Sequence, residues 1–162
     1  MTSETALDAA SPQEFLKAAA DFTENRLWGT LCAAVMVPQG FRKSRENQKR
    51  FDEFIAKLRY GAIGVNQWPG LVYGLMTPPW GGHPGSSLHD PQSGIGWVHN
   101  TFFLDGIEKT VTEGPLTVSP KPVWFPTHKN PEPIAWKLAD FYAKPSTWNL
   151  LRLLGSAVKN GM

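Results

Sequence analysis

The pattern that most constrains the fold is an alternation of helix and buried-strand signals across residues 11–66, with short connections. A first helix is predicted from the N-cap Ser11, which proline follows, to Trp28, with Gly29 ending it. Residues 30–37 are almost entirely apolar, which is typical of a strand buried on both faces in a parallel sheet. A second helix over 45–60 and a short strand over 62–66 repeat this order. Two such pairs predict an α/β fold, a partial parallel sheet with flanking helices.

The second helix has the clearest periodicity. Ser44 is in position to cap it, and Gly61 follows its last residue. Four apolar residues occur at i, i+3, i+4 and i+7, which places them on one helix face: Phe51, Phe54, Ile55 and Leu58. This face is the predicted core side of the helix.

Regular signals fade over residues 67–114, where glycine, proline and tryptophan are frequent. A long stretch of this kind at the carboxyl end of a parallel strand is a typical place for a functional loop. Further along, apolar alternation over 116–125 predicts a strand, which its prolines restrict to a sheet edge. Helices are predicted over 131–143 and, after Ser146, over 147–158. We therefore expect three parts: an α/β part over 1–114, an edge strand within 115–126 and a helical tail over 127–162.

Composition narrows the function classes. The net charge of +2 is small and basic residues are not clustered, so we expect no nucleic-acid partner. No apolar run approaches the ~20 residues of a membrane span, and we expect no membrane partner. Residues 1–10 lack the features of a signal peptide. A single cysteine, Cys32, cannot form an internal disulfide, which indicates a reducing compartment such as the cytoplasm.

Reactive groups are scarce. Cys32 lies within a predicted strand without a cationic neighbour, which indicates a buried structural thiol. His83 and His89 lack the spacing of zinc ligands, so no metal site is expected. The sequence contains neither a Gly-x-Ser-x-Gly motif nor a dinucleotide-binding fingerprint, and it has no carboxylate pair at a convincing acid/base spacing.

An ordered set of motifs nevertheless resembles a known family over about residues 6–125. Asn25-Arg26-Leu27-Trp28-Gly29-Thr30-Leu31 precedes an alanine-rich strand; then come Leu58-Arg59-Tyr60-Gly61, Gly64-Val65-Asn66, Pro79-Trp80-Gly81-Gly82, Ser93-Gly94-Ile95-Gly96 and Glu108-Lys109-Thr110-Val111. This order is similar to the C-terminal part of the aldehyde dehydrogenase family. The departures are Trp80 where the family has phenylalanine, a longer gap between the two glycine motifs, and Trp97-Val98 where the family has Arg-Glu.

The resemblance implies a C-terminal segment of an NAD(P)-dependent aldehyde dehydrogenase, which oxidises aldehydes to carboxylic acids. The family's cysteine nucleophile, glutamate base and nucleotide-binding fold lie upstream of the matching segment. We therefore expect no catalytic residue, no NAD or NADP bound by this chain alone, and an upstream part of the parent chain as partner. A homo-oligomer is also implied, with the strand within 115–126 extending a partner's sheet. The alternative is a non-catalytic oligomerisation or interaction module derived from the family.

Two sets of residues follow from the resemblance. A substrate-channel wall is assigned to Trp68, Trp80, Leu71, Val72 and Tyr73. A structural loop is assigned to Gly61, Asn66, Gly81, Gly82, Ser93, Gly94 and Gly96. The alternative for the two tryptophans is that they only pack against the upstream domain.

Overall fold

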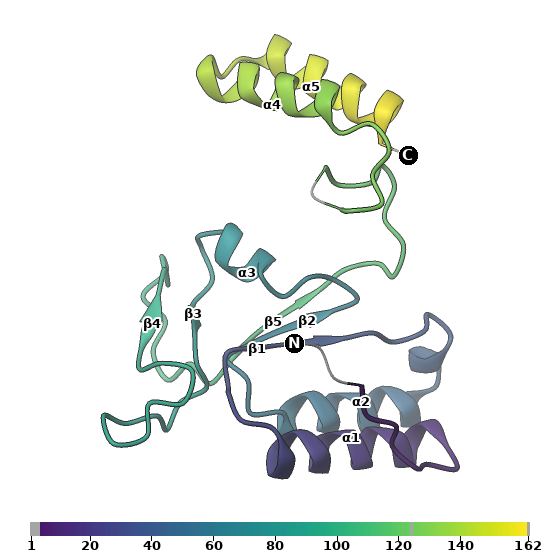
Figure 1. Ribbon diagram of the computed structural model, residues 1–162, viewed down its shortest axis with the longest axis vertical. Helices are drawn as coiled ribbons and strands as arrows, with labels where there is room; N and C mark the ends of the chain where they lie inside the picture. The colour runs from purple at the N-terminus through teal and green to yellow at the C-terminus, as the bar shows by residue number, and fades with distance from the viewer. Residues whose placement is uncertain (1–3, 124, 162) are drawn as a thin grey trace. The chain divides into compact units, whose positions relative to one another are not determined.

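A parallel three-stranded sheet organises the first part of the chain (Figure 1). The computed structural model describes residues 4–123 and 125–161. Its strands are β1 (Cys32–Val35), β2 (Ala62–Val65) and β5 (Thr110–Glu113), in the order β1-β2-β5. Ala33 is in register with Ile63, which in turn is in register with Val111. The predicted α/β class and the parallel pairing of the first two strands are confirmed, whereas β5 lies in a stretch without predicted regular structure.

Two helices, α1 (Pro12–Arg26) and α2 (Arg45–Lys57), pack against each other on one side of this sheet (Figure 1). The predicted caps are confirmed, because the Ser11 and Ser44 hydroxyls accept hydrogen bonds from the third backbone N–H of each helix. Both helices end earlier than predicted. The residue after each helix already has extended backbone, ahead of the glycine expected to end it.

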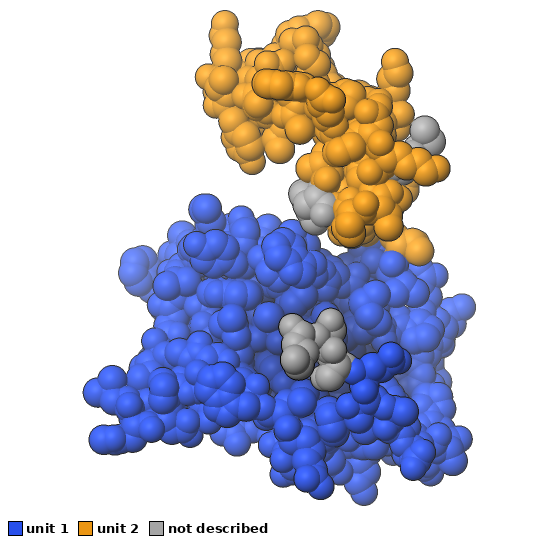
Figure 2. Space-filling model, in the orientation of Figure 1, with its two compact units in different colours: residues 1–116 blue, residues 117–162 orange. Residues whose placement is uncertain are grey.

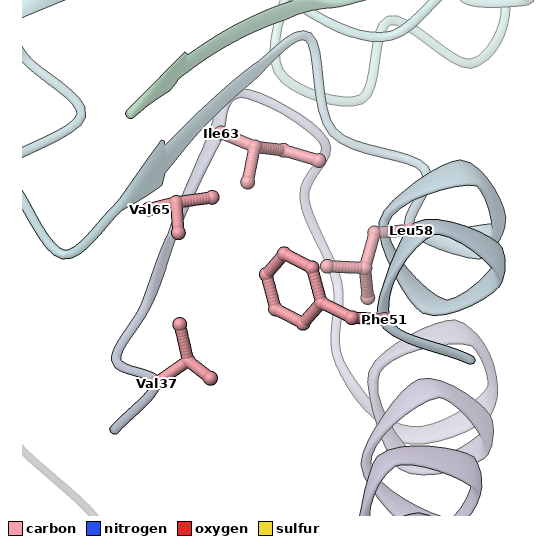
Figure 3. Close-up of a cluster of buried hydrophobic side chains, with 5 residues drawn as sticks. All are labelled: Val37, Phe51, Leu58, Ile63 and Val65. Carbon is pink, nitrogen blue, oxygen red and sulfur yellow. The ribbon is translucent and has the colours of Figure 1, made fainter. Parts of the chain in front are cut away.

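The core lies between α2 and the sheet (Figure 3). Its buried members are Val37, Phe51, Leu58, Ile63 and Val65, with Phe54 and Ile55 packed against them. The predicted apolar face of the second helix is therefore its core face. All four residues of β2 are buried, because β2 is the central strand. The prediction that the first strand is buried on both faces is wrong, since β1 is an edge strand and Ala34 is exposed.

The stretch between β2 and β5 contains short elements. These are the single helical turn α3 (Leu71–Gly74) and the antiparallel pair of β3 (Trp80–Gly81) and β4 (Trp97–Val98). A short 3-10 turn over Phe41–Lys43 lies between β1 and α2. Figure 1 shows the β3–β4 ribbon to one side of the sheet.

The chain divides into two compact units, unit 1 over residues 1–116 and unit 2 over 117–162 (Figure 2). Unit 2 contains the antiparallel helices α4 (Glu132–Ala143) and α5 (Thr147–Asn160), which confirms the predicted helical pair. Ser146 caps α5 as predicted. Among the helices of residues 4–123 and 125–161, none is long and apolar enough to cross a membrane.

The strand predicted over 116–125 does not form within the chain: the residues described there, 116–123 and 125, are bends, one turn and irregular backbone. Its pairing with a partner's sheet stays a prediction. Trp124 lies outside the described residues. The physical reason is the loss of donors at Pro120 and Pro122, which interrupts any ladder of backbone hydrogen bonds. The intervening Lys121 N–H donates instead to the carbonyl of Gly161 within unit 2.

Lys109 fixes the end of α2 to the start of β5. Its ammonium group donates to the carbonyl oxygens of Ala56 and Leu58, both at 2.7 Å, and lies 2.8 Å from the carboxylate of Glu108. The Lys109 side chain is only 10% exposed. A cation at this position satisfies carbonyls that a helix C-terminus leaves without partners and interacts favourably with the helix dipole.

We predict that Lys109→Met lowers the free energy of unfolding by about 1.5–3 kcal/mol, because hydrogen bonds from a charged donor to the carbonyls at the end of α2 are lost. Lys49→Met is the matched control, since the Lys49 side chain is 78% exposed and its ion pair with Glu53 is on the surface. Urea unfolding followed by circular dichroism measures both variants. Equal stability of the two variants would contradict the role of Lys109.

Candidate functional site

The motif segments of unit 1 meet at Thr30, just before β1. The carbonyl oxygen of Thr30 accepts hydrogen bonds from the N–H groups of Gly61 at 2.8 Å and His83 at 3.0 Å. The Thr30 N–H donates to the hydroxyl of Ser93 at 2.6 Å. We call this meeting point, formed by Thr30, Gly61, Gly81, Gly82 and Ser93, the Thr30 junction. It joins the end of α1, the start of β2 and both glycine motifs.

The Thr30 junction depends on glycine because backbones approach each other closely there. A Cβ atom on Gly61 would overlap the carbonyl group of Gly81, and one on Gly81 would overlap the carbonyl oxygen of Gly96. A Cβ on Gly82 would lie 3.1 Å from the carbonyl oxygen of Gly94. The structure thus brings together six of the seven residues assigned to the structural loop, all except Asn66.

Asn66 lies at the opposite end of the strands. It adopts a left-handed conformation with φ of 56°, and its side-chain oxygen accepts the N–H of Val37 at 2.8 Å. Its own N–H donates to the carbonyl of Val35. Asn66 therefore ties the carboxyl ends of β1 and β2 together, whereas the Thr30 junction lies at their amino ends. The loop therefore starts at the carboxyl edge of the sheet, whereas its glycine motifs return to the amino edge.

The residues assigned to a channel wall do not form one surface. Trp80 and Tyr73 meet edge to face, with ring centroids 5.9 Å apart. His99, which the sequence analysis did not assign to this wall, extends the group with a ring 5.0 Å from that of Tyr73. Trp68 is 60% exposed and its ring lies over Gly70. Leu71 is partly buried, and Val72 is fully buried and has no exposed surface with which to line a channel.

A polar cavity of about 400 Å³ opens beside the Thr30 junction. Its lining includes Glu24, Trp28, Arg59, His83 and Ser86. His83 has contacts of its own, with one ring nitrogen 2.9 Å from the carbonyl oxygen of Pro84 and the other 3.4 Å from the carboxylate of Glu108. The hydrogen bond from Lys109, together with the contact from His83, lowers the pKa of the Glu108 carboxyl group. These contacts orient His83 within the loop.

The environment of the Cys32 thiol is that of a structural cysteine. It is partly buried in β1, and burial raises the pKa of this thiol above its ordinary value. A raised pKa decreases the thiolate fraction at neutral pH, the opposite of what a nucleophile requires. Within residues 4–123 and 125–161, no three His, Cys, Asp or Glu side chains are grouped so that they could hold a metal ion.

Comparison of the chain with known proteins finds no matching family model, no matching curated protein and no matching solved structure. The resemblance to aldehyde dehydrogenases rests on the motifs and their order. It stays a prediction.

We predict that Gly61→Ala destabilises the protein by about 1–3 kcal/mol or more, because its Cβ meets backbone that cannot rotate away. Gly74→Ala is the matched control. Gly74 lies in α3 with open space around its Cα and an ordinary φ, so alanine is expected to be neutral or slightly stabilising there. Urea midpoints measure the difference. A Gly61→Ala variant as stable as Gly74→Ala would disprove the close approach.

Cys32 provides a test by chemical labelling. Because burial raises its thiol pKa, we predict that the folded chain reacts with a disulfide reagent at pH 8 more slowly than the urea-unfolded chain. The rate in the folded chain should rise only at higher pH, as the thiol ionises. A folded-state rate equal to or above the unfolded rate would mean that the thiol is activated.

Proposed function

We propose that this chain is a non-catalytic part of an aldehyde dehydrogenase-like oxidoreductase. It supplies an edge of an α/β domain and part of the wall of a substrate channel. The nucleophile, the general base and the nucleotide-binding fold belong to an upstream part of the parent chain. In the parent enzyme NAD or NADP accepts the hydride of the aldehyde, and this chain alone binds neither.

The convergence of the motifs at the Thr30 junction carries this proposal. The segments that contain Thr30, Gly61, Gly81 and Ser93 are separated in sequence, yet backbone hydrogen bonds and glycine contacts join them. The motifs that carry the resemblance thus pack together in this chain, and this packing supports the proposal.

The edges of the three-stranded sheet favour the packing of unit 1 within a larger domain. Both β1 and β5 have a strand partner on one side only. Purely parallel sheets occur almost entirely in α/β domains that cover them on both faces. Large apolar side chains outside the core are also exposed, including Trp28 at 76%, Met36 at 64% and Phe103 at 92%. Exposed apolar side chains in this number favour packing against another protein surface.

Trp80 and Tyr73 are the residues best placed to contact an apolar substrate, because their rings form one aromatic group with His99. Trp68 remains a candidate through its exposed ring, whose alternative role is packing against the upstream domain. We place the chain in the cytoplasm, since its single cysteine suits a reducing compartment. A homo-oligomer remains part of the proposal, with the segment over 115–126 as the contact that the resemblance implies.

The first test is an aldehyde oxidation assay that follows NADH or NADPH formation by absorbance. We predict no turnover by the 162-residue chain with either cofactor. Turnover that survives Cys32→Ala would refute the assignment of a non-catalytic part.

A second test supplies the missing part. An aldehyde dehydrogenase truncated before the region that matches residues 6–125 is co-expressed with this chain, and cofactor reduction is assayed. Wild-type chain should restore activity, and Gly61→Val should not, because it disrupts the Thr30 junction. Gly74→Ala serves as the folded control. Restoration by Gly61→Val to the wild-type level would argue against the proposed role of the junction.

A further inference from the structure

Helix α5 of unit 2 exposes an apolar face. Leu151, Leu154 and Val158 follow the spacing i, i+3 and i+7 and are 56%, 52% and 74% exposed. Leu153 and Ala157, on the other side of the helix, are partly buried within the hairpin. An apolar side of α5 is therefore left exposed.

Large aromatic rings are exposed on both helices of the hairpin. Trp148 on α5 is 68% exposed, and Trp136 and Tyr142 on α4 are 65% and 71% exposed. These rings have an apolar body and a polar edge, and Trp and Tyr are enriched where proteins meet the lipid–water interface. Unit 2 has only 46 residues, so three exposed rings give it a large apolar area in contact with water.

Charge distinguishes unit 2 from unit 1. Residues 117–162 contain six Lys and Arg residues against two acidic ones, a net charge of +4, although the whole chain has only +2. One of the two acidic side chains, Asp140, is 3.2 Å from Lys137. No acidic residue occurs after Asp140, and α5 itself carries Arg152 and Lys159. These two cations lie seven residues apart, so they share one stripe of the helix beside the apolar face.

We propose that the α4–α5 hairpin binds the surface of an anionic lipid bilayer. Helix α5 lies in the plane of the interface, with Leu151, Leu154 and Val158 at the boundary of the acyl chains. Arg152 and Lys159 contact lipid phosphates. A basic amphipathic helix with Trp and Leu on its apolar face is the type of helix that binds membranes in this way.

Two observations favour a bilayer as the occupant. The expectation of no membrane partner rested on the length needed to span a bilayer, and an interfacial helix requires no span. A second copy of unit 2 would cover the apolar face but would bring its own net charge of +4 to the contact, which repels. An anionic surface neutralises this charge and accepts the apolar side chains together. The inference does not depend on the proposed function of unit 1.

Co-sedimentation of the full chain with lipid vesicles tests this proposal. Vesicles of phosphatidylcholine and phosphatidylglycerol should bind the chain, and pure phosphatidylcholine should bind it much more weakly. Arg152→Gln with Lys159→Gln should weaken binding to the anionic vesicles about tenfold or more. Added salt should weaken it further. Lys49→Gln with Arg50→Gln on α2 of unit 1 is the matched control and should bind like wild type.

A second pair of variants tests the apolar contact. Leu151→Asp and Val158→Asp should abolish vesicle binding, while circular dichroism shows that both variants remain folded, since neither residue is buried. Absence of binding to anionic vesicles by the wild-type chain would overturn the proposal. Binding that both aspartate variants retain would do so too. A dimer by sedimentation velocity that Leu151→Asp dissociates, without vesicle binding, would assign the face to a second copy.

Discussion

The arrangement of unit 1 depends on the carbonyl oxygen of Thr30. It accepts hydrogen bonds from the start of β2 and from the segment after β3, so that one backbone atom sets the position of both. Gly61 can approach only because it has no side chain to meet Gly81. Once β2 is placed by this contact, its carbonyl at Gly61 accepts the N–H of Thr110 and places β5. The three strands thus follow from one close backbone approach.

Local sequence signals were enough to predict the helices, but they were insufficient to predict the strands at the sheet edges. Ser11, Ser44 and Ser146 cap helices as the sequence indicates, because a cap requires only residues within one turn. Residues 110–113 form β5 through pairing with β2; they are rich in β-branched residues, but four residues are too few to indicate which strand they pair with. Apolar alternation over 116–125 gave a local strand signal, which the missing N–H groups of its prolines outweighed.

The candidate site was likewise predictable from the sequence only in part. The sequence indicates that Gly61, Gly81 and Gly82 shape backbone, and the structure shows which carbonyls they approach. It could not indicate the edge of the sheet at which they meet, because that depends on how the chain between β2 and β3 returns. Val72 was assigned to a wall although it is buried, since α3 is a single turn and too short for an amphipathic pattern.

The two units expose apolar side chains in different ways, and this difference matches the separate roles proposed for them. In unit 1 most of the exposed groups, such as Trp28 and Phe103, lie in loops, and the net charge over residues 1–116 is −2. Irregular apolar loops fit the irregular surface of another protein part. In unit 2 the exposed groups of α5 follow helical spacing next to basic residues. A straight apolar stripe with a cationic border fits a flat anionic surface, and a helix presents it without any change in backbone.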